Sequence, residues 1–187
     1  MEAFLISTGV VAIAEIGDKT QLLAILLASR FRRPWAIVAG IFAATVANHL
    51  LAATVGTLVA NWLGGETLRW ILGLSFIAMG LWALVPDKMD EGGAEAGKAG
   101  RFGAFVATLV AFFLVEMGDK TQIATVGLAA RFDNLTMVTL GTTLGMMLAN
   151  VPAVFLGEAA TKVVPLKFVR AAAAAIFVAV GVVTLLW

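Results

Sequence analysis

The chain has 187 residues, of which 61% are hydrophobic and 13% charged, and its formal net charge at pH 7 is +1. Soluble domains carry about 25% charged and about 45–50% apolar residues, so this composition indicates lipid rather than water as the main solvent. The near-neutral charge gives no indication of nucleic acid binding, and the absence of cysteine excludes disulfides and thiolate metal sites. We therefore expect an integral membrane protein that has no nucleic acid partner and no resident cofactor.

Six segments are predicted to cross a bilayer, because a membrane helix needs roughly 20 mostly apolar residues. The longest polar break between them, residues 86–100, is rich in glycine and charge, as is typical of a flexible linker. It would lie in the cytoplasm and separate a first three-helix unit, residues 1–85, from a second, residues 101–187. The fold class is thus all-α, with expected spans at residues 3–29, 36–60, 68–85, 102–130, 136–160 and 167–186.

One polar motif occurs twice, 101 residues apart. The first copy is Glu15 to Gln21 (EIGDKTQ) and the second is Glu116 to Gln122 (EMGDKTQ); around them, residues 15–31 and 116–132 are identical at 10 of 17 positions. Because each half holds an odd number of spans, the second half must enter the membrane from the opposite side. The sequence therefore predicts two inverted three-helix repeats, an arrangement that transporters commonly use. Further identities at the same offset are Arg30/Arg131, Gly40/Gly141, Gly56/Gly157, Arg69/Arg170 and Gly80/Gly181.

Lysine and arginine are distributed unevenly between the two membrane sides. Outside the motifs, nine fall on the side that holds residues 30–33 and the linker, and two fall on the other. The positive-inside rule places the first side in the cytoplasm, so both termini should be extracytoplasmic.

The motifs place ionisable side chains inside apolar spans, where such groups are costly and usually functional. Residues three or four apart share one helix face, so each copy should form one stripe on a helix. The inverted symmetry predicts that the two stripes meet near the bilayer midplane. Gly17 and Gly118 permit either a close backbone approach or a local break of the helix. The expected stripes are Glu15, Asp18 and Gln21 or Leu22 in the first copy, and Glu116, Asp119 and Gln122 in the second.

The four carboxylates and the two lysines, Lys19 and Lys120, leave a formal charge of −2, which one divalent cation or two protons would neutralise. Low dielectric disfavours the charged form of a carboxylate, so metal and protons would compete for the same oxygens. An oxygen-only site suits magnesium, calcium or manganese. The lysines could merely fix helix packing, but buried ion pairs contribute little net stability. We favour a mixed role, in which they hold the carboxylates and fill the site when metal is absent. Neutral oxygen ligands could come from Thr20, Thr121, Gln21 and Gln122.

Three further polar residues lie in the middle of predicted spans: Asn48, His49 and Asn150. They could form a second ring of ligands, with His49 as a proton relay. They could equally make hydrogen bonds between helices, worth about 0.6–2 kcal/mol in membranes. The sequence leaves both interpretations open.

Two copies of Glu-x-Gly-Asp-Lys-Thr on inverted repeats resemble the GDT family of divalent cation/proton antiporters, which includes Golgi manganese and calcium transporters and a bacterial manganese exporter. The resemblance covers nearly the whole chain. It implies a fold related to the calcium/cation antiporters, with alternating access. It also implies that Glu15, Asp18, Glu116 and Asp119 carry the cation, with the motif threonines and glutamines nearby. For a compact bacterial type of member it implies export of Mn²⁺, or else Ca²⁺, across the cytoplasmic membrane.

Three function classes compete. The first is a secondary transporter that exchanges a divalent metal for protons. A passive channel is the second, because carboxylate rings also select cations in channels. The third is an intramembrane enzyme with two aspartates in one site, but the adjoining lysines and the lack of a nucleophile and base argue against it. The residues favour the transporter and leave its oligomeric state undetermined.

Overall fold

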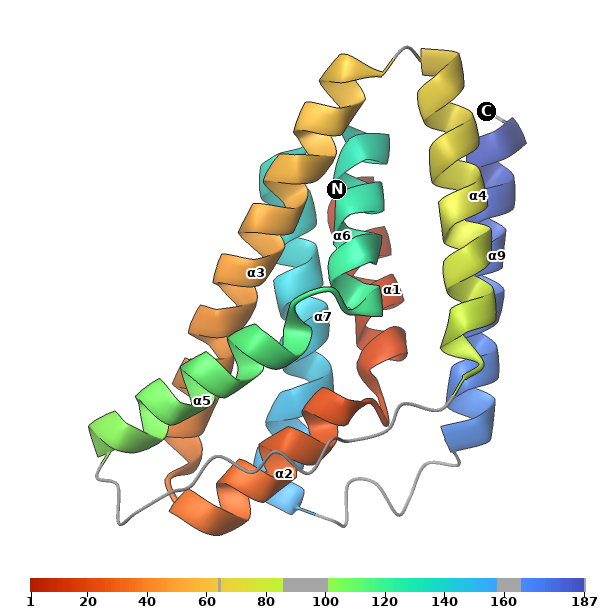
Figure 1. Cartoon of the computed structure of the whole chain (residues 1–187). Helices are drawn as coiled ribbons and strands as arrows, with labels where there is room; N and C mark the ends of the chain where they lie inside the picture. The colour runs from red at the N-terminus through yellow and green to blue at the C-terminus, as the bar shows by residue number, and fades with distance from the viewer. Residues whose placement is uncertain (64, 86–100, 158–165, 187) are drawn as a thin grey trace.

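The computed structural model describes residues 1–63, 65–85, 101–157 and 166–186, and in this part of the chain all regular structure is helical (Figure 1). The predicted fold class is therefore confirmed as all-α, whereas the predicted linker, residues 86–100, lies outside the described residues. The helices are α1 (Glu2–Glu15), α2 (Lys19–Phe31), α3 (Pro34–Trp62), α4 (Gly65–Ala83), α5 (Arg101–Glu116), α6 (Lys120–Phe132), α7 (Leu135–Leu156) and α9 (Leu166–Leu186).

Helices long and apolar enough to cross a membrane are α3, α7 and residues 167–186 of α9. The pair α5–α6 passes the same test as one bent unit, so the described residues hold three such helices, or four with this pair. The segments expected at 3–29 and 68–85 are helical, as α1–α2 and α4, but are not in this set. Large apolar side chains cover the outside of the molecule, among them Leu58, Leu81 and Leu148. Such a surface suits lipid.

Two of the expected spans are not continuous helices. α1 ends at Glu15 and α2 begins at Lys19, and α5 and α6 are separated in the same way and meet at an angle of 71°. At each break one glycine has a positive φ, 79° at Gly17 and 77° at Gly118. Residues with a Cβ rarely adopt this conformation, so of the two possibilities the glycines left open, the break is the one that forms.

Glycines bring the long helices α3 and α7 against the broken ones. A Cβ added at Gly40 of α3 would lie 2.8 Å from the Phe105 carbonyl oxygen of α5, and one at Gly141 of α7 would lie 2.5 Å from the Phe4 carbonyl oxygen of α1. The two contacts correspond at the offset of 101 residues. Small residues permit such close backbone approach in membranes.

Helices α4 and α9 form a separate pair that runs side by side (Figure 1). Gly73 meets Gly181, and Gly80 meets Ala174, and these two contacts also correspond at the offset of 101. The pair packs against α1 and α6. Phe76 of α4 reaches Gly127 of α6 in this interface.

The core is divided into two apolar clusters. One contains side chains of α1, α4, α6 and α9 and includes Phe76 and Phe177. The other is built on α2 and α5 and includes Leu27 and Phe112. Helices α3 and α7 contribute to both, whereas α4 and α9 contribute only to the first among the described residues. The α4–α9 pair is therefore placed asymmetrically with respect to the two helix breaks.

Candidate metal site

The two helix breaks place the acidic side chains of each motif on different helices. Glu15 is the last residue of α1 and Asp18 is the N-cap of α2; Glu116 and Asp119 hold the same places in α5 and α6. The prediction that each motif forms a stripe along one helix is therefore wrong, because the helix breaks at the glycine of positive φ between the two acids. A carboxylate at a helix N-terminus is favoured by the helix dipole.

The glutamines brace the breaks. The Gly17 N–H donates to Gln21 Oε1 at 2.9 Å, and the Gly118 N–H donates to Gln122 Oε1 at 2.6 Å. This resembles a capping box, in which a residue at the third helical position returns to a free N–H before the helix. Both side-chain oxygens, which were expected as neutral ligands, are thus engaged within their own motifs. The spacing D-x-x-Q is the signal that could have indicated this.

The threonines orient the glutamates. Thr20 Oγ1 donates to Glu15 Oε2 at 2.6 Å, and Thr121 Oγ1 donates to Glu116 Oε2 at 2.9 Å. All four residues are buried. Because each hydroxyl fixes one carboxylate oxygen, the other oxygen of each glutamate remains for a further partner. Glu15 Oε1 and Glu116 Oε1 are both buried and accept no hydrogen bond from the described residues.

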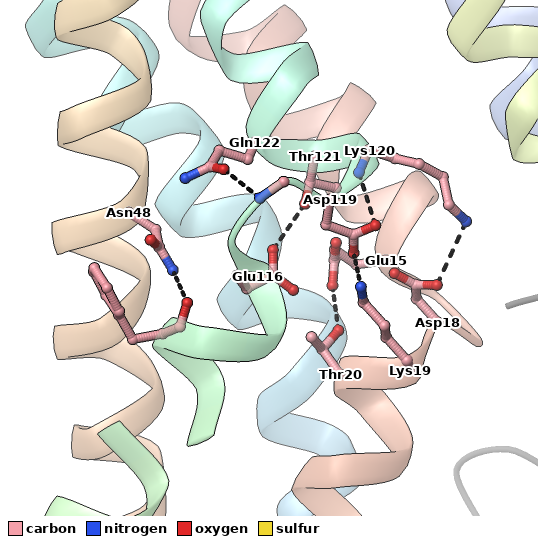
Figure 2. A network of polar contacts seen from close by, with 12 residues as sticks. Glu15, Asp18, Lys19, Thr20, Asn48, Glu116, Asp119, Lys120, Thr121 and Gln122 are labelled. Carbon is pink, nitrogen blue, oxygen red and sulfur yellow. Dashed lines mark hydrogen bonds and ion pairs between the residues drawn. The ribbon is translucent and has the colours of Figure 1, made fainter. Parts of the chain in front are cut away.

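Two ion pairs connect the motifs crosswise, as Figure 2 shows. Lys19 Nζ lies 3.4 Å from Asp119 Oδ2, and Lys120 Nζ lies 3.6 Å from Asp18 Oδ1. Each lysine thus contacts the aspartate of the other copy, an arrangement that the sequence analysis did not predict. The Lys19 side chain is 24% exposed and the Lys120 side chain 8%. The pairs hold the two helix breaks against one another.

Three carboxylates converge at this junction. Glu15, Asp18 and Asp119 each offer an oxygen, these oxygens lie within 4.8 Å of one another, and all three residues are buried. Glu116 belongs to the same polar network (Figure 2) but not to this three-carboxylate cluster. Hard divalent cations prefer such oxygen ligands. The buried Glu15 Oε1, without a hydrogen-bond donor among the described residues, is a second indication that the cluster accommodates a cation.

The other predicted polar residues have separate contacts. Asn48 donates to the Phe113 carbonyl oxygen at 3.0 Å, across from α3 to the last turn of α5, where the break leaves carbonyl groups without helical partners. Asn150 donates to the Met146 carbonyl oxygen within its own helix. Both ring nitrogens of His49 are buried without a hydrogen-bond partner among the described residues. For Asn48 the geometry matches the interhelical hydrogen bond that the sequence left as an alternative.

A small pocket lies beside this junction, between the first helix break and the ends of α4 and α9. Its lining includes Asp18 and Lys120 from the motifs, Ala83 of α4, and Arg170 and Phe177 of α9. Sequence analysis did not assign the α9 residues to the site. Phe76 and Phe177 also correspond at the offset of 101 residues, which is the signal that could have drawn attention to them.

Comparison with known proteins gives one consistent result. The chain matches the family model described as "Divalent cation/proton antiporter GDT1" over residues 3–91 and 104–187. It is 50% identical over 185 residues to a Vibrio cholerae protein named "Putative manganese exporter", covering 98% of this chain and 90% of that protein. It is also 28% identical to GDT1-like protein 5 of Arabidopsis thaliana, covering 100% of this chain and 96% of that protein. No solved structure matches the chain.

Proposed function

Because this chain belongs to the GDT1 family of divalent cation/proton antiporters, which are membrane transporters rather than enzymes, we propose that it exports Mn²⁺ from the cytoplasm in exchange for protons through the junction of its two motifs. The observation that supports the site is the buried cluster of Glu15, Asp18 and Asp119, whose ligand oxygens lie within 4.8 Å of one another. Manganese is proposed from the name of the Vibrio relative, and Ca²⁺ is the alternative cargo.

Charge balance explains how exchange could work. The four carboxylates, with Glu116 as the fourth member, and the two lysines carry a formal charge of −2. One divalent ion or two protons would bring the buried site to neutrality, and an uncompensated buried charge is costly. Metal and protons therefore exclude one another, which couples the movement of one to that of the other.

The lysines act as tethered cations in this proposal. Their crossed contacts with Asp119 and Asp18 hold both aspartates in place while no metal is bound. An arriving divalent ion would displace the ammonium groups from the aspartate oxygens. The threonines and glutamines act indirectly, by orienting the glutamates and by bracing the backbone of the two breaks.

The proposed architecture has six crossings in two inverted repeats, with α1–α2 and α5–α6 each counted as one broken crossing. Three sets of contacts that correspond at the offset of 101 support it: the crossed ion pairs, the helix contacts of Gly40 and Gly141, and the α4–α9 interface. Discontinuous helices that meet at the midplane are a common construction of transporter ion sites. The lysine and arginine distribution supports an orientation with residues 30–33 on the cytoplasmic side of a bacterial inner membrane and both termini on the other side.

The test is metal-driven proton movement in proteoliposomes loaded with a pH-sensitive dye. An inward Mn²⁺ gradient should move protons outward, and Asp18→Asn and Asp119→Asn should each abolish this signal. The matched control is Asp133→Asn, because Asp133 is an exposed carboxylate at the end of α6 and asparagine tolerates its positive φ of 45°. Parallel assays with Ca²⁺ and Mg²⁺ establish the selectivity.

A passive channel gives a different result in the same vesicles. It would carry Mn²⁺ down its gradient without a coupled pH change, and an imposed pH step would not concentrate the metal. Either observation would contradict the proposed antiport and support a passive channel instead.

A further inference from the structure

The three-carboxylate cluster is not symmetric with respect to the sequence repeat. The offset of 101 exchanges Glu15 with Glu116 and Asp18 with Asp119. If each member of the cluster is replaced by its counterpart in the other copy, the result is a second possible cluster that contains Glu116, Asp119 and Asp18. The cluster in this structure and its counterpart therefore share both aspartates and differ in one glutamate.

The packing of the surrounding helices also differs between the two repeats. On one side of the junction, Phe76 of α4 packs against Gly127 of α6. The corresponding pair is Phe177 of α9 and Leu26 of α2. Leu26 is 43% exposed, and Phe177 instead lines the pocket that Asp18 also lines. The α4–α9 pair thus packs on one side of the junction, and the pocket beside Asp18 lies next to the first turns of α9.

The crossed ion pairs and the threonine contacts, in contrast, occur in both copies. Glu116 is held by Thr121 as Glu15 is held by Thr20, and it likewise has a buried oxygen without a hydrogen-bond donor among the described residues. Glu116 thus shares with Glu15 the threonine contact and the buried oxygen that a metal could use. It nevertheless does not belong to the cluster in this conformation.

We propose that Glu15 and Glu116 alternate as the third carboxylate of the ion site. Glu15 completes the site while the path is open toward the start of α9, and Glu116 completes it while the path is open toward the opposite face. Asp18 and Asp119 bind the ion in both states. This inference rests on the proposed metal transport, and it assigns each glutamate to one face of the membrane.

The test compares Mn²⁺ transport in inside-out and right-side-out membrane vesicles. Glu15→Gln should raise the half-saturating Mn²⁺ concentration by about tenfold or more at the face where α9 begins, and by less than about threefold at the other face. Glu116→Gln should show the reverse pattern. Asp18→Asn and Asp119→Asn should abolish Mn²⁺ transport from both faces alike, which makes them the matched comparison.

Equilibrium Mn²⁺ binding to the purified variants provides a second measurement that does not need a complete transport cycle. Since each single variant keeps one intact cluster, the loss of affinity in the Glu15→Gln/Glu116→Gln double variant should exceed the product of the two single losses. Equal effects of both variants at both faces, or independent losses that simply multiply, would overturn the alternation and indicate one four-carboxylate site. Failure of the unsubstituted protein to couple Mn²⁺ to protons would instead overturn the proposed function.

Discussion

At the scale of single residues, the crossed ion pairs are the contacts with the clearest consequence for transport. A buried cation beside a carboxylate competes with any metal that the carboxylate binds, since both interact with the same negative charge. Lys19 and Lys120 are 3.4 and 3.6 Å from the aspartates of the opposite motif. In the proposed metal site they would reduce the negative charge and so limit how tightly a divalent ion is retained.

The Lys19→Met substitution is therefore predicted to strengthen Mn²⁺ binding and to slow transport. The loss of one positive charge should tighten equilibrium Mn²⁺ binding by about tenfold or more, because like-charge repulsion across a few ångströms is strong in a buried site. Transport should become slower, since release becomes harder. Titration calorimetry and the vesicle assay measure the two effects, with Lys167→Met, an exposed lysine on α9, as the control. Weaker Mn²⁺ binding in Lys19→Met would show that the lysine mainly holds Asp119 in place.

At the scale of elements, each helix break is formed by the same three residue types. A glycine supplies the positive φ, an aspartate begins the next helix, and a glutamine returns to the glycine N–H. The break also separates the glutamate from the aspartate, so the two acids of one motif approach the site from two helices. A continuous helix would instead arrange them along one face.

Gly118→Ala tests the importance of this backbone conformation. A Cβ at Gly118 meets no atom within 4 Å, so its cost is the strained φ alone, about 1–2 kcal/mol. We expect a lower unfolding temperature and reduced transport. Gly9→Ala is the matched control, because a Cβ there also meets nothing within 4 Å and Gly9 lies inside α1; it should be neutral or stabilising. Equal stability of the two variants would contradict a requirement for positive φ at the break.

At the scale of the whole molecule, each helix break separates a helix of one apolar cluster from a helix of the other. The α1–α6 side carries the α4–α9 pair, whereas the α2–α5 side has its own apolar cluster with α3 and α7 (Figure 1). Small residues join α4 to α9, and the pair packs against α1 and α6 rather than against α2 and α5.

The membrane orientation can be tested directly, because the chain contains no cysteine. Ser29 near the end of α2 and Thr67 near the start of α4 are both exposed and should lie on opposite sides. Ser29→Cys should react with a membrane-impermeant maleimide only in inside-out vesicles, and Thr67→Cys only in right-side-out vesicles. Reaction of both cysteines from one side would contradict the orientation deduced from the lysines and arginines.

The fold class, the family and the type of ion could be predicted from the sequence alone. The apolar composition and span lengths predict a helical membrane protein, and the two motifs identify its family, since local composition and spacing need no knowledge of the fold. The charge of the motif residues likewise indicates a hard divalent cation. These features depend on residue types along the chain.

Only the tertiary structure decided how the motif residues meet. The sequence suggested one stripe per motif, left a break at the glycines open, and treated the four carboxylates alike. The breaks at Gly17 and Gly118, the pairing of each lysine with the other copy's aspartate, and the place of Glu116 outside the cluster depend on contacts between residues about 100 positions apart. Two nearly identical motifs carry nearly the same local information, so the difference between them depends on how the surrounding helices pack.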